Sequence, residues 1–377
     1  MLVVAYLQHT NGMASWCWEA AHALQEAGQP VLLVCSHFVT IPEDCKVETL
    51  RFDPPPPKLV TLREKVVHEW ERVSPQSTGF VGYLHEHLVQ SGIQPTAYLL
   101  NQTSLQDPSV SVPQYVTAWA YPTSFWSYFA KVGRYGGWHL SRSASRIMMT
   151  TIGWWPKDWR AYRSADGVLA VSQRLNHVLV KHGVKSAVVH PGTEVPPATP
   201  LEKSTPPYKI ITAALDLEEP RKRVRWLLEA LHQMPDWAQF SLTLVGGASQ
   251  EFQQWACRNE FPAVFTGPLP RSEVQSLMAQ HELFVFGSSL DDWGYVLVEA
   301  MGNHLCVIAP NLSPFDEIVG DTGVLYDPSA PESLTRPLAA LLRGDISAHR
   351  AAAHRRAETL FSRAAFAESL LAWSRPA

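Results

Sequence analysis

Short apolar runs alternate with helix-patterned segments along most of this 377-residue chain, and this alternation constrains its fold most strongly. Near the start, residues 2–7 have the pattern of a buried strand, 14–27 that of a helix with one apolar face, and 31–35 that of a second buried strand. Because buried parallel strands have continuous apolar runs, this segment predicts one strand–helix–strand unit of a parallel sheet. The same pattern predicts further strands at 97–100, 115–118, 167–171 and 187–190.

A proline-rich segment interrupts the alternation. Pro191-Gly192 is followed by five more prolines up to residue 207, and such a segment predicts a linker. Beyond it, a helix is predicted over 222–232, and strands at 208–213, 240–245, 263–266, 283–286, 306–309 and 324–326. We therefore expect two doubly wound α/β domains, residues 1–195 and 205–359, facing each other across a cleft.

Composition excludes several classes of protein. The chain is 46% hydrophobic and 18% charged with a net charge of −4, so general disorder is excluded and the overall charge gives no reason to expect a nucleic-acid binder. The five cysteines lack the spacing of a zinc site or a disulfide framework, so we expect reduced thiols and no metal. The first residues lack the basic lead of a signal peptide, and no apolar run is long enough to span a membrane. We expect a cytoplasmic protein that contacts a membrane, if at all, only peripherally on its inner face.

Two acidic residues near the end of a predicted strand are the first candidate site. Asp291 and Glu299 stand eight residues apart, with Gly294 between them and a helix pattern after it. We expect Asp291 in the loop after strand 283–286, and Glu299 about two turns into the helix on the same side. Such a pair can bind hydroxyl groups on two parts of one ligand, while the helix N-terminus favours a phosphate. The alternative is a capping loop followed by an exposed glutamate.

A group of basic residues opens the helix predicted at 222–232. Arg221, Lys222, Arg223 and Arg225 lie where cations oppose the helix dipole. This placement favours a nearby anion, and the alternative is a solvated helix start.

Both segments resemble parts of the family 4 glycosyltransferases. The acidic signature of that family is Glu, seven residues, Glu; here Asp291 replaces the first glutamate and Glu299 keeps the second. Residues 220–231 are similar to the lysine motif of the family. Further similarities occur, in the family's order, at 166–172, 190–192, 311–319 and 323–328. The match covers most of the second domain and is specific there, and it is weaker in the first domain.

The resemblance implies the two-domain GT-B fold and transfer of a sugar from a nucleotide-diphosphate sugar with retained anomeric configuration. It implies that Glu299 binds the ribose, that Asp291 contacts hydroxyls of the donor sugar, and that Lys222 with Arg221 neutralises the leaving diphosphate without a metal or other cofactor. It also implies that the final helix, in 360–377, packs back on the first domain. The further donor-binding residues expected from it are Asn11, Gly12, Gly246, Gly247, Asp292, Trp293, Gly294, Tyr295 and Val296.

One departure from the family lies in the first domain. The family has a histidine near the end of the strand that here covers 115–121, and this chain has none there. Trp119 or Tyr121 takes its place, and His139 and His9 are candidate substitutes. The change could alter the acceptor or weaken the activity.

Aromatic and basic residues gather in the same region. Residues 115–163 hold six of the 14 tryptophans and carry a charge of about +6. This composition fits an anionic membrane surface, a pocket for a glycan or lipid-linked acceptor, a groove for single-stranded nucleic acid, or a packed core with a solvated rim. We favour an acceptor-facing and membrane-facing surface, with Trp119, Tyr121, Trp126 and His139 on the acceptor side.

Two classes of function therefore remain. The first is a retaining glycosyltransferase. The second is a non-catalytic relative that binds a nucleotide-sugar or glycan and acts as a partner protein, which the changed first glutamate and the missing histidine favour. A nucleotide-sugar epimerase would share the fold but not the whole order of motifs.

Overall fold

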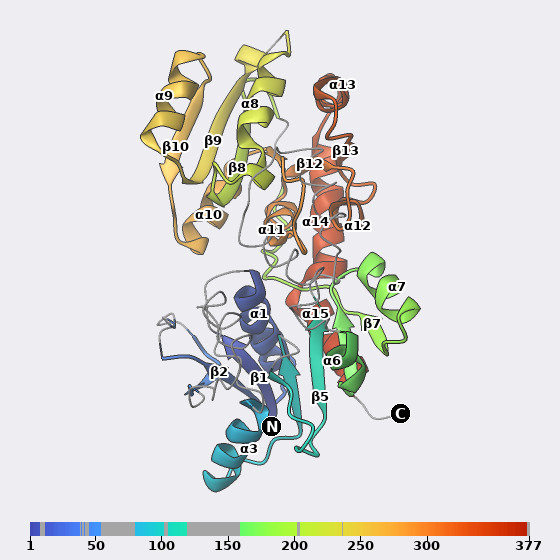
Figure 1. Ribbon diagram of the computed structural model, residues 1–377. Coiled ribbons are helices and arrows are strands. Elements are labelled where there is room, and N and C mark those ends of the chain that lie inside the picture. Colours follow the sequence, from blue (N-terminus) through green and yellow to red (C-terminus); the bar gives the residue numbers. More distant parts are fainter. Residues whose placement is uncertain are drawn as a thin grey trace, which may run out of the picture. The chain divides into compact units, whose positions relative to one another are not determined.

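The computed structural model describes residues 1–7, 12–37, 39, 41, 45–53, 80–101, 105–118, 159–201, 204–235 and 237–374. Within these ranges the chain forms two compact units, each built on its own sheet (Figure 1). The first contains described residues up to 192 together with 363–374, and the second contains Thr193–Ser362.

The first unit has a seven-stranded parallel sheet in the order β3-β2-β1-β4-β5-β6-β7. Strands β2 (Val31–Cys35) and β4 (Ala97–Leu100) are buried along their whole length and flank β1 (Leu2–Leu7). The remaining strands are β3 (Glu48–Arg51), β5 (Gln114–Ala118), β6 (Gly167–Ala170) and β7 (Ser186–Val188). The helices are α1 (Gly12–Glu26), α3 (Phe80–Gln90), α6 (Trp159–Ser164), α7 (Gln173–Lys181) and α15 (Arg363–Ser374).

The second unit has a six-stranded sheet in the order β10-β9-β8-β11-β12-β13, and every pairing in it is parallel. Its strands are β8 (Tyr208–Asp216), β9 (Phe240–Gly247), β10 (Ala263–Gly267), β11 (Leu283–Val285), β12 (Cys306–Pro310) and β13 (Val324–Tyr326). Its helices are α8 (Val224–His232), α9 (Gln250–Arg258), α10 (Arg271–Met278), α11 (Tyr295–Gly302), α12 (Phe315–Val319), α13 (Pro331–Leu342) and α14 (Ser347–Phe361), with 3₁₀ turns at Pro220–Lys222 and Trp237–Gln239.

Three predicted helices have other limits in the structure. The helix expected over 14–27 is α1, which spans Gly12–Glu26. The helix expected over 222–232 begins only at Val224, because Arg223 has a left-handed backbone (φ 53°) after the 3₁₀ turn. The C-terminal helix was expected to include Phe361, but Phe361 ends α14 and the extended Ser362 (φ −71°, ψ 160°) separates it from α15. Helix α15 lies in the first unit, where Phe366 meets the edge of Trp16 of α1 with ring centroids 6.0 Å apart.

Part of the linker is held by a pair of histidines. The rings of His304, after α11, and His354, on α14, stack in parallel with centroids 3.9 Å apart. Thr199 donates its backbone N–H to His304 Nε2 (3.3 Å), and His354 Nε2 donates to the carbonyl of Pro196 (2.8 Å). Burial, with His354 and Arg350 nearby, lowers the pKa of His304 to about 4.

This arrangement predicts that the folded protein loses stability in acid already above pH 4. In the unfolded chain His304 titrates near 6.5, so between pH 6.5 and about 4 the unfolded state binds more protons than the folded state. We expect the free energy of unfolding to fall over this range, by up to ~3 kcal/mol from this residue. Urea unfolding at pH 7.5 and 4.5 should show a smaller fall in His304→Asn, and an equal fall in both proteins would contradict the assignment.

Candidate functional site

The candidate site lies at the carboxyl edge of the second sheet, where β8 and β11 are neighbours although far apart in sequence. The chain leaves β8 toward β9 on one side and reaches β11 on the other, so this is the point where strand order reverses. Ligands of doubly wound sheets bind at such a switch point. The loop after β8 carries Arg221 and Lys222, and the loop after β11 carries Asp291.

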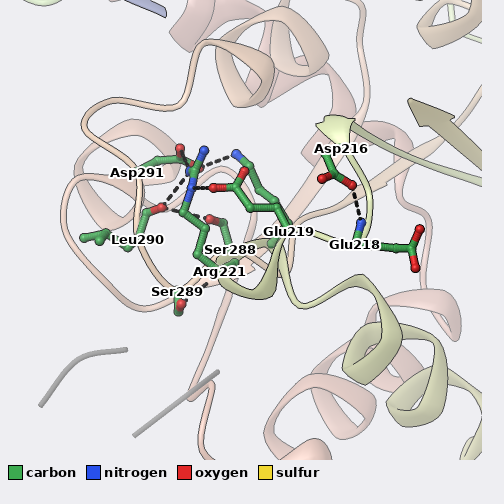
Figure 2. Close-up of polar contacts among 9 residues, drawn as sticks. Asp216, Glu218, Glu219, Arg221, Ser288, Ser289, Leu290 and Asp291 are labelled. Carbon is green, nitrogen blue, oxygen red and sulfur yellow. Dashed lines mark hydrogen bonds and ion pairs between the residues drawn. The ribbon is translucent and has the colours of Figure 1, made fainter. Parts of the chain in front are cut away.

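The predicted cations and the predicted aspartate meet directly, and Figure 2 shows Arg221 beside Asp291. Lys222 Nζ lies 2.8 Å from Asp291 Oδ2, and Arg221 Nη1 bonds Asp291 Oδ1. Arg221 also donates from Nη1 to the carbonyl of Leu290 (2.9 Å) and from Nε to Glu219. Two cations thus share one aspartate, and Glu219 binds one of them.

The charges of this cluster stabilise one another in their ionised forms. Burial alone would raise the pKa of Asp291, but Lys222 and Arg221 hold that pKa below its ordinary value. Burial alone would lower the pKa of Arg221, but Asp291 and Glu219 raise it. At neutral pH the site therefore presents two fixed cations and an ionised carboxylate, which can bind a phosphate and a hydroxyl respectively.

Close backbone packing fixes the two loops on each other. Ser289 donates its N–H to the carbonyl of Arg221 (2.8 Å). A Cβ at Gly287 would lie 2.7 Å from the carbonyl oxygen of Lys222, a distance that requires glycine or a backbone shift. Gly287 was not predicted as a site residue, although a glycine directly after a buried strand is the usual sign of such an approach.

The glycine pair at the end of β9 lies beside the end of β8. Gly246 has φ +136°, and a Cβ there would collide with the carbonyl of Ala214. The carbonyl of Gly247 accepts the N–H of Leu217 (2.9 Å), so both glycines border the loop that carries Lys222. Their predicted contact with a donor stays a prediction.

Helix α11 begins at the predicted acidic motif. Gly294 (φ +122°) caps it without a side-chain hydrogen bond, and Tyr295 and Val296 are its first residues. Asp292 is exposed, whereas Trp293 is 2% exposed and its ring packs nearly perpendicular to that of Phe361, with centroids 5.7 Å apart. The Trp293 side chain therefore belongs to the core, and only its backbone is left for a ligand.

Glu299 has an arginine partner that the sequence did not point out. Since α11 begins at Tyr295, Glu299 lies about one turn into the helix, not two as predicted. Arg271 Nε donates to Glu299 Oε1 (2.8 Å), and its Nη2 donates to the hydroxyl of Thr193. Arg271 is the first residue of α10, a cation at a helix N-terminus. The argument applied to Lys222 could therefore have found it.

Most of the predicted first-domain site lies outside the described residues. This holds for His9, Asn11, Trp119, Tyr121, Trp126 and His139, while Gly12 is the first residue of α1.

The described end of the aromatic stretch packs within the first unit. Trp159 stacks on His182 with centroids 4.1 Å apart, Tyr162 is buried, and Arg163 donates to the carbonyl of His182 from Nε (3.0 Å) and Nη2 (2.8 Å). These contacts pack α6 against the end of α7, and the acceptor-facing and membrane-facing surface stays a prediction.

Neither a metal-binding cluster nor a membrane-spanning helix is found among the described residues. Across those ranges no group of three or more His, Cys, Asp or Glu side chains could hold a metal ion. In the same part of the chain, no helix combines the length and apolarity needed to span a membrane.

Parts of the sequence are similar to known sugar transferases. Residues 208–344 match the profile of the family described as glycosyl transferases group 1. The chain is 25% identical over 134 residues to O-antigen chain mannosyltransferase B of Escherichia coli, and 37% identical over 87 residues to sulfoquinovosyl transferase SQD2 of Arabidopsis thaliana. The first alignment covers 34% of this chain and 35% of the mannosyltransferase, and the second covers 22% of this chain and 17% of the sulfoquinovosyl transferase. The chain therefore spans about a third or less of each curated relative.

Solved structures resemble the whole chain. Sucrose-phosphate synthase from Thermosynechococcus elongatus has a TM-score of 0.68 at 16% identity, covering 99% of this chain and 97% of that one. WaaG, a glycosyltransferase involved in lipopolysaccharide biosynthesis, has a TM-score of 0.65 at 16% identity with full coverage of both chains. The chain has the GT-B fold. HepE from Anabaena, solved with UDP-glucose, has a TM-score of 0.60 at 17% identity, covering 99% of this chain and 98% of that one.

The predicted two-domain GT-B fold is thereby confirmed. At these identities the structural likeness shows the fold alone, whereas the family profile covers the unit that holds Lys222, Asp291 and Glu299. Together the two findings support a GT-B glycosyltransferase.

Proposed function

We propose that this chain transfers a sugar from a nucleotide-diphosphate sugar to a hydroxyl of a glycan or lipid-linked acceptor. The observation that carries the proposal is the pair of cations, Arg221 and Lys222, on Asp291 at the switch point of the second sheet. That unit matches the group 1 profile, and the structural relative HepE was solved with UDP-glucose.

The chemistry needs positive charge where the bond to the donor breaks. The leaving nucleoside diphosphate gains negative charge in the transition state, and preorganised cations stabilise it. Lys222 and Arg221 would bind its phosphates, in competition with Asp291, whose carboxylate would then be available to the sugar hydroxyls. Glu299 would bind the ribose.

The proposal extends to a retaining, family 4 type mechanism without a metal. Retention would follow if an oxygen of the leaving phosphate takes the proton of the incoming hydroxyl on the same face of the sugar, so no protein nucleophile is required. Since Lys222 and Arg221 supply the charge, we expect EDTA to leave the rate unchanged. The acceptor side and an anionic membrane contact depend on residues 119–158, which lie outside the described ranges, and stay predictions.

Release of the sugar to water tests the proposal without an identified acceptor. Wild-type protein incubated with UDP- and GDP-sugars should release nucleoside diphosphate, and Glu299→Ala should lower kcat/KM by about 100-fold or more because the ribose loses a charged partner. Glu332 is an exposed glutamate on α13, so Glu332→Ala is the matched control and should leave kcat/KM almost unchanged. Unchanged donor affinity and rate in Glu299→Ala would contradict the assignment of the site.

The same assay separates the non-catalytic alternative. Asp291 in place of glutamate and the missing first-domain histidine favour that alternative. A protein of that kind would bind a nucleotide-sugar, and Glu299→Ala would weaken the binding, but no sugar would be released by the wild type.

A further inference from the structure

Arg271 joins two residues that lie far apart in sequence. Its Nε donates to Glu299 Oε1 (2.8 Å), and its Nη2 donates to Thr193 Oγ1. The Glu299 side chain is 14% exposed and that of Arg271 is 37% exposed, whereas Thr193 is fully buried. Arg271 therefore reaches from a buried anchor to a carboxylate that solvent and ligands can still approach.

The anchor is where the chain enters and leaves the second unit. Thr193 is the first residue of that unit and Ser362 is its last. The two form a parallel β-bridge, and Thr193 donates its N–H to the carbonyl of Phe361 (2.9 Å). The ring of Phe361 is fully buried and packs nearly perpendicular to that of Trp293, one residue before the cap of α11. Backbone pairing and packing thus fix the residues to which Arg271 is bound.

The shape of arginine suits this bridge. A guanidinium is a planar fork whose donors point in fixed directions, so bonds to Thr193 and Glu299 together set where the carboxylate lies. A lysine presents a single ammonium on a flexible stem and cannot hold both partners in one geometry. A glutamate released from the bridge would lose side-chain entropy each time it bound a ligand.

We propose that Arg271 is a positioning residue that holds the Glu299 carboxylate for the two adjacent hydroxyls of a nucleotide ribose. On this account Arg271 makes the site discriminate ribonucleotides from nucleotides that lack those hydroxyls. The inference rests on the proposed function, because it assigns the ribose to Glu299.

A purely structural role for the bridge makes a different prediction. If Arg271 only ties α10 to Thr193, its loss would lower the stability of the protein and weaken the binding of every nucleotide by a similar factor. If Arg271 positions Glu299, its loss would lower the affinity for ribonucleotides and leave the affinity for dideoxynucleotides unchanged.

Calorimetric titration with UDP, GDP and their 2′,3′-dideoxy analogues distinguishes the two roles. We expect the wild type to favour a ribonucleotide over its dideoxy analogue by about 10-fold or more, the value of a hydrogen bond to a charged group. Arg271→Ala should reduce this ratio of affinities to about 2-fold, because only the binding of the ribonucleotide becomes weaker. Arg271→Lys and Thr193→Val should give intermediate ratios, and Arg336→Ala, an exposed arginine on α13, should keep the wild-type ratio.

The failure of this inference differs from the failure of the proposed function. A wild type that discriminates, with Arg271→Ala and Arg271→Lys discriminating equally well, overturns the role of Arg271 alone. A wild type that binds none of these nucleotides overturns the proposed function and this inference with it. If Arg271→Ala does not fold, Arg271→Lys and Thr193→Val decide, and wild-type ratios in both would overturn the inference.

Discussion

Lys222→Met is expected to lower sugar release from the donor by about 100- to 1000-fold, the usual effect of removing one preorganised group that stabilises developing negative charge. Lys222 Nζ lies 2.8 Å from Asp291 Oδ2 and 5.6 Å from the centroid of the Phe286 ring, and the Lys222 side chain is 15% exposed. The charge therefore acts where water screens it little. Methionine keeps the apolar stem, and Arg221 still pairs with Asp291, so the fold should survive.

Arg225→Met is the matched control for Lys222→Met. Arg225 belongs to the same basic segment but is exposed, and its guanidinium lies 4.2 Å from the centroid of the Trp255 ring. Steady-state kinetics should show a rate within about twofold of wild type, as expected for a cation outside the site. Equal losses in both variants would mean that general positive charge, and not Lys222, supports the reaction.

Arg363→Ala is expected to lower the free energy of unfolding by about 3–5 kcal/mol, the usual effect of removing one partner of a buried ion pair. Glu19 of α1 is fully buried, and Arg363 Nε, at the start of α15, lies 2.7 Å from Glu19 Oε2. Arg363 Nη1 also binds the exposed Glu26 at 2.9 Å. Without Arg363, the Glu19 carboxylate would remain buried in the interface between α1 and α15 without this cation.

Urea unfolding of a set of variants isolates the buried charge. The double variant Glu19→Gln with Arg363→Met should recover most of the lost stability, because it removes both charges and keeps the packing. Arg174→Ala, an exposed arginine on α7, should stay within about 0.5 kcal/mol of wild type. A loss of less than about 1 kcal/mol in Arg363→Ala would show that α15 is held by its apolar contacts alone.

The sequence predicts those strands best that are buried on both faces. The predicted limits of β2 and β4 are those of the structure, since a fully apolar run bounded by turns has few other interpretations. Edge strand β3 was missed because Glu48–Arg51 is half exposed and has one aliphatic residue. The break at Ser362 was also missed, because Phe361 and Phe366 are both buried apolar residues and the pattern continues across it.

The candidate site was predicted in part, for a related reason. The motifs pointed to Lys222, Asp291 and Glu299, but their partners depend on which strands are neighbours in the sheet. Asp291 meets Lys222 because β8 and β11 pair, and Glu299 meets Arg271 because α10 and α11 lie together. No spacing along the chain shows these contacts. The basic residues were predicted to need an anion, and the structure provides one in Asp291.

The most direct test of the account is ¹H NMR of the sugar released from a nucleotide-diphosphate sugar by the purified protein. We predict stoichiometric appearance of nucleoside diphosphate and free sugar in the presence of EDTA, with the first-formed anomer having the configuration of the donor. Lys222→Met should slow the appearance of nucleoside diphosphate and of free sugar by the same factor. A first-formed anomer of inverted configuration would contradict the retaining mechanism, and the absence of release from every UDP- and GDP-sugar tested would contradict sugar transfer itself.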